Sequence, residues 1–100
     1  MTTPDRFSRD PHEELRDCRN AIEVVDRRIV ALLAQRVALA LRAAGAKRAA
    51  GLPLVDRARE AEVIDRVVAE GRGHDLPADG IAQVFERIVA MSRRVQEDAR

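Results

Sequence analysis

The stretch RNAIEVVDRRIVALLAQRVALALRAAGAK, residues 19–47, carries one unbroken helical pattern, without proline and without glycine before Gly45. Its apolar positions recur at alternating steps of three and four residues, the spacing of a helix that packs along one seam against other helices. Followed from just before the stretch, this seam consists of Leu15, Cys18, Ile22, Val25, Ile29, Leu32, Arg36, Leu39 and Ala43. We therefore expect one long helix with helical partners along this seam.

Arg36 occupies a seam position where an apolar residue is expected. A buried guanidinium is costly to desolvate unless an anion meets it. Lys47 follows eleven residues later, about three helical turns, and projects from nearly the same face. Arg19 precedes Arg36 by seventeen residues, about 25 Å along a helix. One small anion cannot contact both arginines on a single straight helix.

The composition indicates one small all-α domain of 100 residues. Apolar content comes from Ala, Leu, Val and Ile, and the only aromatic residues are Phe7 and Phe85. A chain this short buries a limited core, so a long helix needs neighbours and oligomerisation is expected. Acidic and basic residues are interspersed and the net charge is +1, which argues against nucleic-acid binding.

The sequence also favours a cytoplasmic protein without membrane contact. The first residues are polar and charged, so we expect no signal peptide, and we expect no run long enough to span a bilayer. The single cysteine, Cys18, lies on the seam and is predicted to be a buried small hydrophobe.

Start and stop signals divide the chain into an arm and three helices. Residues 1–9 are predicted to form a flexible N-terminal arm, and residues 10–100 the helical domain. Asp10 caps a first helix that runs from Pro11 to about Ala50. The second runs from Arg57, capped by Asp56, to about Glu70, and residues 71–75 form a turn. The third runs from Pro77 to about Asp98. The inward residues of these two helices include Ala61, Ile64, Val67, Val68, Ile81, Val84, Phe85, Ile88 and Val95, with polar Ser92 and Gln96 in the same stripe as the last five.

Taken one at a time, the polar features have ordinary explanations. Arg36 is equally consistent with an ion pair to a nearby carboxylate, and Arg19 with a solvated surface residue. The charged run at residues 56–60 is typical of a capped first turn, and Ser92 with Gln96 suits an interface. His12 and His74 lack partners at ligand spacing, so no metal site is predicted.

Taken together, these residues have an order that resembles the all-helical (AroQ-type) chorismate mutases. The pattern consists of Arg19-x-x-Ile22-x-x-x-Asp26, Leu32-Leu33-x-x-Arg36, Lys47, Asp56-x-x-Arg59-Glu60 and Ser92-x-x-x-Gln96. It covers nearly the whole chain after the N-terminal arm. The resemblance implies an intertwined homodimer in which each active site receives an arginine from the first helix of the other subunit.

The resemblance also implies a reaction and a set of site residues. Chorismate, which carries two carboxylates, would rearrange to prephenate, on the way to phenylalanine and tyrosine, with no cofactor, metal, base or nucleophile. Arg19 of the partner and Arg36 would each clamp a carboxylate, with Ser92 assisting. Lys47 and Gln96 would donate to the ether oxygen. Glu60, with the backbone around Asp56, would hold the ring hydroxyl and orient Lys47, and Arg59 would complete the polar wall.

Three alternatives remain open on the sequence. An isochorismate-pyruvate lyase of the same fold is disfavoured because this chain keeps the Arg59-Glu60 pair. A mutase for 4-amino-4-deoxychorismate would differ from a chorismate mutase in one contact, the one to the ring hydroxyl or amine, and Glu60 could accept a hydrogen bond from either group. A non-catalytic helical dimerisation module, with Arg36 merely ion-paired, is the alternative from another class.

Overall fold

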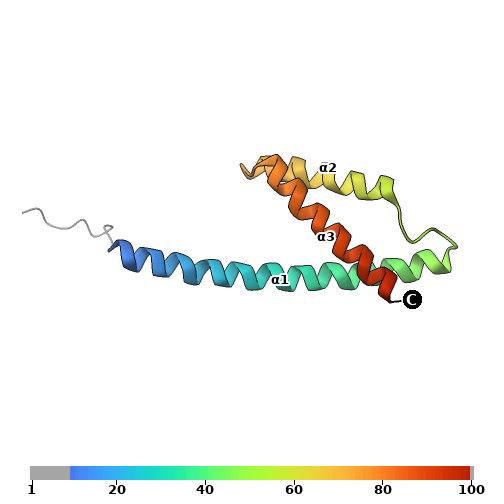
Figure 1. Ribbon diagram of the computed structural model, residues 1–100, viewed down its shortest axis with the longest axis horizontal. Coiled ribbons are helices and arrows are strands. Elements are labelled where there is room, and N and C mark those ends of the chain that lie inside the picture. The colour runs from blue at the N-terminus through green and yellow to red at the C-terminus, as the bar shows by residue number, and fades with distance from the viewer. Residues whose placement is uncertain (1–9, 100) are drawn as a thin grey trace, which may run out of the picture. The chain divides into compact units, whose positions relative to one another are not determined.

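In the computed structural model, which describes residues 10–99, those residues form three helices and no strand. Helix α1 spans Pro11–Ala49, α2 spans Arg57–Gly73 and α3 spans Ala78–Asp98 (Figure 1). Their lengths of 39, 17 and 21 residues confirm the predicted all-α class and its order of long, short and medium helices. The arm predicted for residues 1–9 lies outside the described residues.

The chain divides within α1 into two units, the first ending at Leu32 and the second beginning at Leu33. The described part of the first unit opens at Asp10, whose side chain accepts a hydrogen bond from the backbone N–H of His12 at 3.1 Å. All its described side chains are exposed. The prediction that Cys18 is buried is therefore wrong for the single chain: its Sγ lies 3.7 Å from Glu14 Oε1 on an exposed helix surface.

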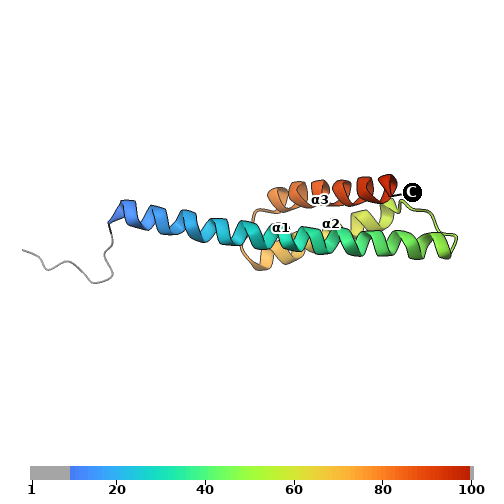
Figure 2. The same ribbon diagram turned by 90° about the horizontal axis from the view of Figure 1, so that it is seen from below.

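In the second unit, α2 and α3 pack against each other, and the C-terminal half of α3 lies beside the last part of α1 (Figures 1 and 2). The covered stripe of α1 consists of Leu33, Arg36, Val37, Ala40, Leu41, Ala44 and Lys47. Leu39 and Ala43, which belong to the predicted seam, are exposed in the single chain. This end of α1 thus has two adjacent apolar faces, and its own chain covers only one of them.

The end of α1 explains how the chain turns back. Gly51 adopts a left-handed φ of 70°, and the Leu52 N–H donates to the Lys47 carbonyl at 2.8 Å while Gly51 N–H donates to the Arg48 carbonyl at 3.2 Å. These two bonds form a Schellman motif, which satisfies the last carbonyls of a helix. Asp56 then opens α2, its Oδ1 accepting from the Arg59 N–H at 3.0 Å, as predicted.

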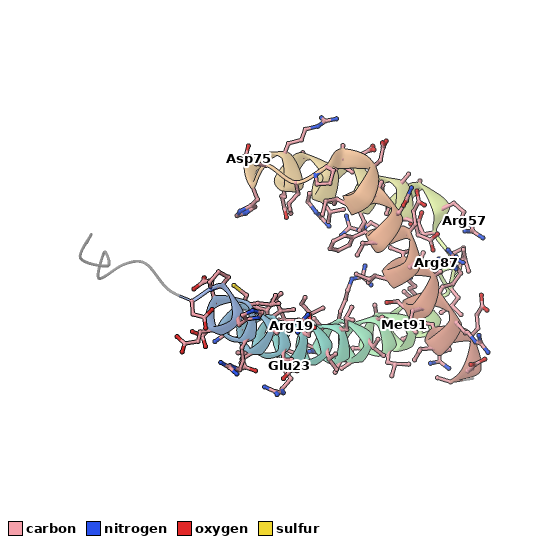
Figure 3. All side chains as sticks on the ribbon, turned by 60° about the vertical axis from the view of Figure 1, so that its left-hand side comes forward. Arg19, Glu23, Arg57, Asp75, Arg87 and Met91 are labelled. Carbon is pink, nitrogen blue, oxygen red and sulfur yellow. The ribbon has the colours of Figure 1, made fainter. Side chains whose placement is uncertain are left out.

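The second helix continues further than the sequence indicated. We expected it to end near Glu70, but it runs to Gly73. Asp75, labelled in Figure 3, lies in the turn that follows. It takes the left-handed position, with φ 57°. Leu76 N–H donates to the Gly71 carbonyl at 2.9 Å and Asp75 N–H to the Arg72 carbonyl at 3.2 Å. The glycines at 71 and 73 therefore remain helical, and an aspartate makes the turn.

Gly71 is the point where α2 and α3 approach closely. A Cβ atom placed on Gly71 would lie 3.0 Å from the Ile81 side chain. The predicted inward residues of these two helices are half-buried except Ala61 and Val84, which are exposed, whereas Val63 is half-buried in place of Ala61.

By length and composition alone, α1 is long and apolar enough to cross a membrane. The expectation that no stretch reaches this length is therefore wrong. One such helix is weak grounds for a membrane assignment, because core helices of soluble proteins and signal sequences pass the same test.

Candidate active site

A cavity of about 320 Å³ lies in the second unit, with walls from α1, α2, α3 and the segment before α2. Its apolar lining includes Leu54, Val63 and Val89. Its polar lining consists of Arg36, Lys47, Asp56, Arg59, Glu60, Arg66, Ser92, Arg93 and Gln96. Five of these side chains are cationic and two are carboxylates, so the cavity favours a small anion.

Arg36 reaches into the cavity from α1 and is held there by α3. Its Nη1 donates to Ser92 Oγ at 2.7 Å, and Ser92 is 6% exposed. A guanidinium has five N–H donors, so this bond fixes its direction and leaves donors for an anion. The structure therefore explains why an arginine occupies the apolar stripe of α1: Ser92 accepts one of its hydrogen bonds, and the rest of its guanidinium faces a cavity.

Gln96 and Lys47 present donors to the same cavity. The Gln96 amide, 8% exposed, donates from Nε2 to the Ala40 carbonyl at 2.7 Å. Lys47 Nζ donates to the Leu54 carbonyl at 3.0 Å. Because an amide group has two N–H donors and an ammonium has three, each side chain keeps at least one donor for a ligand.

The first turn of α2 supplies the opposite wall. Asp56 lines the cavity, and its side chain caps this helix. The Arg59 side chain is 55% exposed and donates to Glu62 Oε2 at 3.4 Å. Its guanidinium lies at the rim, where exposed ion pairs are weak and easily exchanged.

Glu60 is the most strongly engaged group in the site. Arg93 donates to both its oxygens, from Nε to Oε2 at 3.1 Å and from Nη2 to Oε1 at 2.9 Å, and Arg57 Nη1 donates to Oε1 at 3.2 Å. The hydrogen bond from Arg93 is the main cause that lowers the pKa of Glu60, against the opposing effect of desolvation. The same bond raises the pKa of Arg93. Glu60 is therefore a fixed carboxylate.

Seven of the eight predicted site residues line this one cavity: Arg36, Lys47, Asp56, Arg59, Glu60, Ser92 and Gln96. The eighth, Arg19, belongs to the first unit. The expectation that Glu60 orients Lys47 is wrong for the described structure, because Glu60 pairs with two arginines and Lys47 bonds to a backbone carbonyl.

Sequence reasoning missed Arg93 and Arg66. Arg93 precedes Gln96 by three residues, the spacing that places two side chains on one helix face. That signal was present, but the adjacent Arg94 makes the pair read as a solvated charged surface. Within residues 10–99, no group of three or more His, Cys, Asp or Glu side chains gathers that could hold a metal ion.

The chain is similar in sequence to a family of known proteins. Residues 18–97 match the sequence profile of the family described as chorismate mutase type II. The chain is 32% identical over 87 residues to a bifunctional chorismate mutase/prephenate dehydratase of Enterobacter agglomerans, covering 87% of this chain and 22% of that protein. The corresponding protein of Escherichia coli (strain K12) is 33% identical over 79 residues, covering 79% of this chain and 20% of the relative.

These bifunctional relatives are several times longer, and the chain spans about a fifth of their length. A relative of similar size is the chorismate mutase of Methanocaldococcus jannaschii, which is 27% identical over 85 residues, covering 85% of this chain and 86% of that protein.

Proposed function

Because this chain belongs to the chorismate mutase type II family, we propose that it catalyses the rearrangement of chorismate to prephenate, a step toward phenylalanine and tyrosine. The observation that carries the proposal is the convergence of seven residues, predicted from three separate helices, on one cationic cavity. Residues 10–100 are the proposed catalytic domain.

The substrate's charges fit the cavity's donors. Chorismate carries two carboxylates, and Arg36, steadied by Ser92, is proposed to bind one of them through the fork of its guanidinium. Arg59 at the rim completes the cationic wall. Glu60 and the backbone beside Asp56 are proposed to hold the ring hydroxyl.

The rearrangement breaks an ether bond while a carbon–carbon bond forms within the same molecule. Negative charge grows on the ether oxygen in the transition state, so donors aimed at that oxygen accelerate the reaction. Lys47 and Gln96 each keep a free donor beside the cavity, and we assign them this role. Binding both ends of the substrate also holds its reacting carbons together.

We further propose that two copies form an intertwined dimer, in which Arg19 of the partner binds the second carboxylate. Two observations support this. Large apolar side chains of the first unit are exposed, among them Ile22, Val25 and Ile29, and a second copy would cover them. Seventeen residues of helix separate Arg19 from Arg36, so Arg19 is too remote in sequence to serve its own chain's cavity. The dimer is proposed to act in the cytoplasm, without membrane or nucleic-acid partners.

The direct test is chorismate consumption, followed by its absorbance, with prephenate identified as the product. Arg36→Ala removes a carboxylate contact and should reduce kcat/KM by about a hundredfold or more. The matched control is Arg42→Ala, an exposed arginine of α1 outside the cavity, which should retain activity. No consumption by the parent chain would refute the proposal, and release of pyruvate from isochorismate instead would identify a lyase.

A further inference from the structure

Two guanidiniums hold the Glu60 carboxylate and occupy most of its hydrogen-bond acceptor positions. Arg93 contacts it as a two-pronged fork at 3.1 and 2.9 Å, and Arg57 adds a third bond at 3.2 Å. The Glu60 and Arg93 side chains are 22% and 24% exposed, whereas that of Arg57 is 72% exposed. In Figure 3, Arg57 lies at the start of α2, and it is not part of the cavity wall.

The lone pairs of Glu60 show what remains for a ligand. A carboxylate accepts about four hydrogen bonds, two at each oxygen. Oε1 already accepts from both arginines, and Oε2 accepts only from Arg93 Nε. One acceptor position at Oε2 is therefore left, enough for a single donor.

The charges around Glu60 also limit which ligand group can bind there. The charged side chains that face this carboxylate or share its cavity come from all three helices: Arg36 and Lys47 on α1, Asp56, Arg57, Arg59 and Arg66 at or within α2, and Arg93 on α3. Arg93 and Arg57 both lie at hydrogen-bond distance from Glu60, so its single negative charge is already balanced. A neutral donor meets no penalty there, but a further cation would meet uncompensated cations.

We propose that Arg93 is a positioning residue for substrate selection: it holds Glu60 as a charge-balanced, single-position acceptor that takes a ring hydroxyl and disfavours an ammonium group at the same place. This inference rests on the proposed function and deepens it. It assigns the site to chorismate rather than to 4-amino-4-deoxychorismate, whose amine is protonated at neutral pH.

The test compares kcat/KM for the two substrates in the parent chain and in Arg93→Gln. Removing one unit of positive charge a few ångströms from the bound ammonium should improve the relative use of the amino substrate by about tenfold or more. Glu60→Gln removes the carboxylate that holds Arg93 in place, so a second substitution at Arg93 should change the substrate ratio less than it does in the parent chain. The readout is the ratio of kcat/KM for the two substrates. A merely structural loss would lower kcat/KM for both substrates by the same factor and leave this ratio unchanged.

The pH profile gives a second readout. Arg93 lowers the pKa of Glu60, so in Arg93→Gln the carboxyl should protonate at higher pH and lose its acceptor position. The acid limb of kcat/KM for chorismate should therefore move to higher pH in this variant. Arg57 is exposed and is not among the residues that line the cavity, so in Arg57→Gln the same limb should move in the same direction by a smaller amount.

Two further variants separate charge from structure. Arg93→Lys keeps the cation but not the fork, so its substrate ratio should stay within about threefold of the parent. Arg94→Gln alters the adjacent arginine, which is exposed and outside the cavity, and should change neither ratio nor pH profile. The inference is overturned if Arg93→Gln leaves the substrate ratio and the acid limb unchanged, or if Arg93→Lys loses selectivity as fully as Arg93→Gln. A parent chain that converts neither substrate would instead refute the proposed function.

Discussion

Gln96 is the residue whose chemistry most directly tests the proposed mechanism. Its amide donates to the Ala40 carbonyl at 2.7 Å, and a neutral amide donates at any pH. In Gln96→Glu an ionised carboxylate would face that carbonyl without a proton to share, in a buried position. Both effects favour the protonated acid and raise its pKa above the free value of about 4.3.

The expected result is that Gln96→Glu has partial activity in mild acid and loses it as the pH rises from about 5 to 8. Activity is partial even in acid because a carboxylic acid has one donor where the amide has two. The measurement is kcat/KM for chorismate across this range. Gln83→Glu, an exposed site on the same helix, is the matched control and should follow the parent profile. Parallel profiles for all three proteins would show that Gln96 does not donate to the ether oxygen.

The ion pair between Glu60 and Arg93 predicts a pH dependence of stability apart from any substrate. The hydrogen bond from Arg93 lowers the pKa of Glu60 below its ordinary value. A carboxyl with a lowered folded-state pKa stabilises the fold above the unfolded-state pKa, and this contribution is lost as the pH falls through the folded-state pKa. The contribution is therefore complete near neutral pH and disappears in acid.

Urea unfolding of Arg93→Gln and the parent should show this directly. We expect the variant to lose about 1 kcal/mol of unfolding free energy at about pH 7 and less at about pH 3. Arg94→Gln, whose partner is an exposed carboxylate, should differ little from the parent at either pH. A difference between Arg93→Gln and the parent that does not shrink in acid would show that Arg93 stabilises by packing alone.

At the scale of the elements, the turn between α2 and α3 gives opposite predictions for neighbouring residues. Asp75 holds a left-handed φ of 57°, which costs about 1 kcal/mol in a residue with a side chain, so Asp75→Gly should raise the unfolding free energy. Gly73 is helical and a Cβ there meets nothing within 4 Å, so Gly73→Ala should stabilise by about 1 kcal/mol.

Gly71→Ala should instead lower the unfolding free energy, since its Cβ would lie 3.0 Å from the Ile81 side chain, which would have to shift within the contact between α2 and α3. Thermal unfolding midpoints of the three variants are sufficient to compare these effects. A stabilising Gly71→Ala would mean that the two helices do not meet at this point as closely as described.

This turn also shows where sequence reasoning succeeds and where it stops. Capping chemistry at Asp56 and the helix-ending signal at Gly51 were readable because both rest on local bonds. The end of α2 could not be predicted in this way, because glycine normally marks the end of a helix. Here Gly71 packs on Ile81 and stays helical. Likewise, periodicity identified an apolar seam on α1 but could not say which of two adjacent apolar faces its own chain covers.

The residues of the candidate site also fall into those that the sequence predicts and those that it does not. The seven cavity residues were predictable because a family pattern fixes their order, but the fork between Arg93 and Glu60 joins residues 33 positions apart. Only the packing of α3 against α2 brings that pair together, and no local spacing encodes it.

At the scale of the whole molecule, the exposed seam predicts the oligomeric state. Leu15, Ile22, Val25, Ile29 and Leu32 are all exposed in the single chain, and contiguous apolar surface of this kind marks an interaction site. We expect sedimentation at micromolar concentration to give twice the chain mass. Ile22→Glu with Ile29→Glu should yield monomers and abolish activity, whereas substituting the exposed Met91 of α3 by Glu should do neither. A folded, active monomer of the parent chain would refute both the dimer and the shared site.

Mixed dimers can show whether Arg19 serves the pocket of its own chain or that of the partner. If the sites are shared, Arg19→Ala damages the partner's pocket and Lys47→Ala damages the pocket of its own chain. A mixed dimer of the two variants then places both lesions in one pocket and leaves the other intact. Random pairing of equal amounts makes about half the dimers mixed, so about a quarter of all pockets should become active.

Each variant alone should be nearly inactive, because each loses charge stabilisation worth several kcal/mol in a water-poor site. The measurement is chorismate consumption after the two variants are refolded together, compared with each refolded by itself, with mixed dimers verified by mass. If every pocket were built within one chain, each pocket of a mixed dimer would still carry one lesion, and mixing would restore nothing. A gain near a quarter of parental activity therefore requires an arginine that crosses between subunits, and the absence of any gain would remove Arg19 from the partner's site.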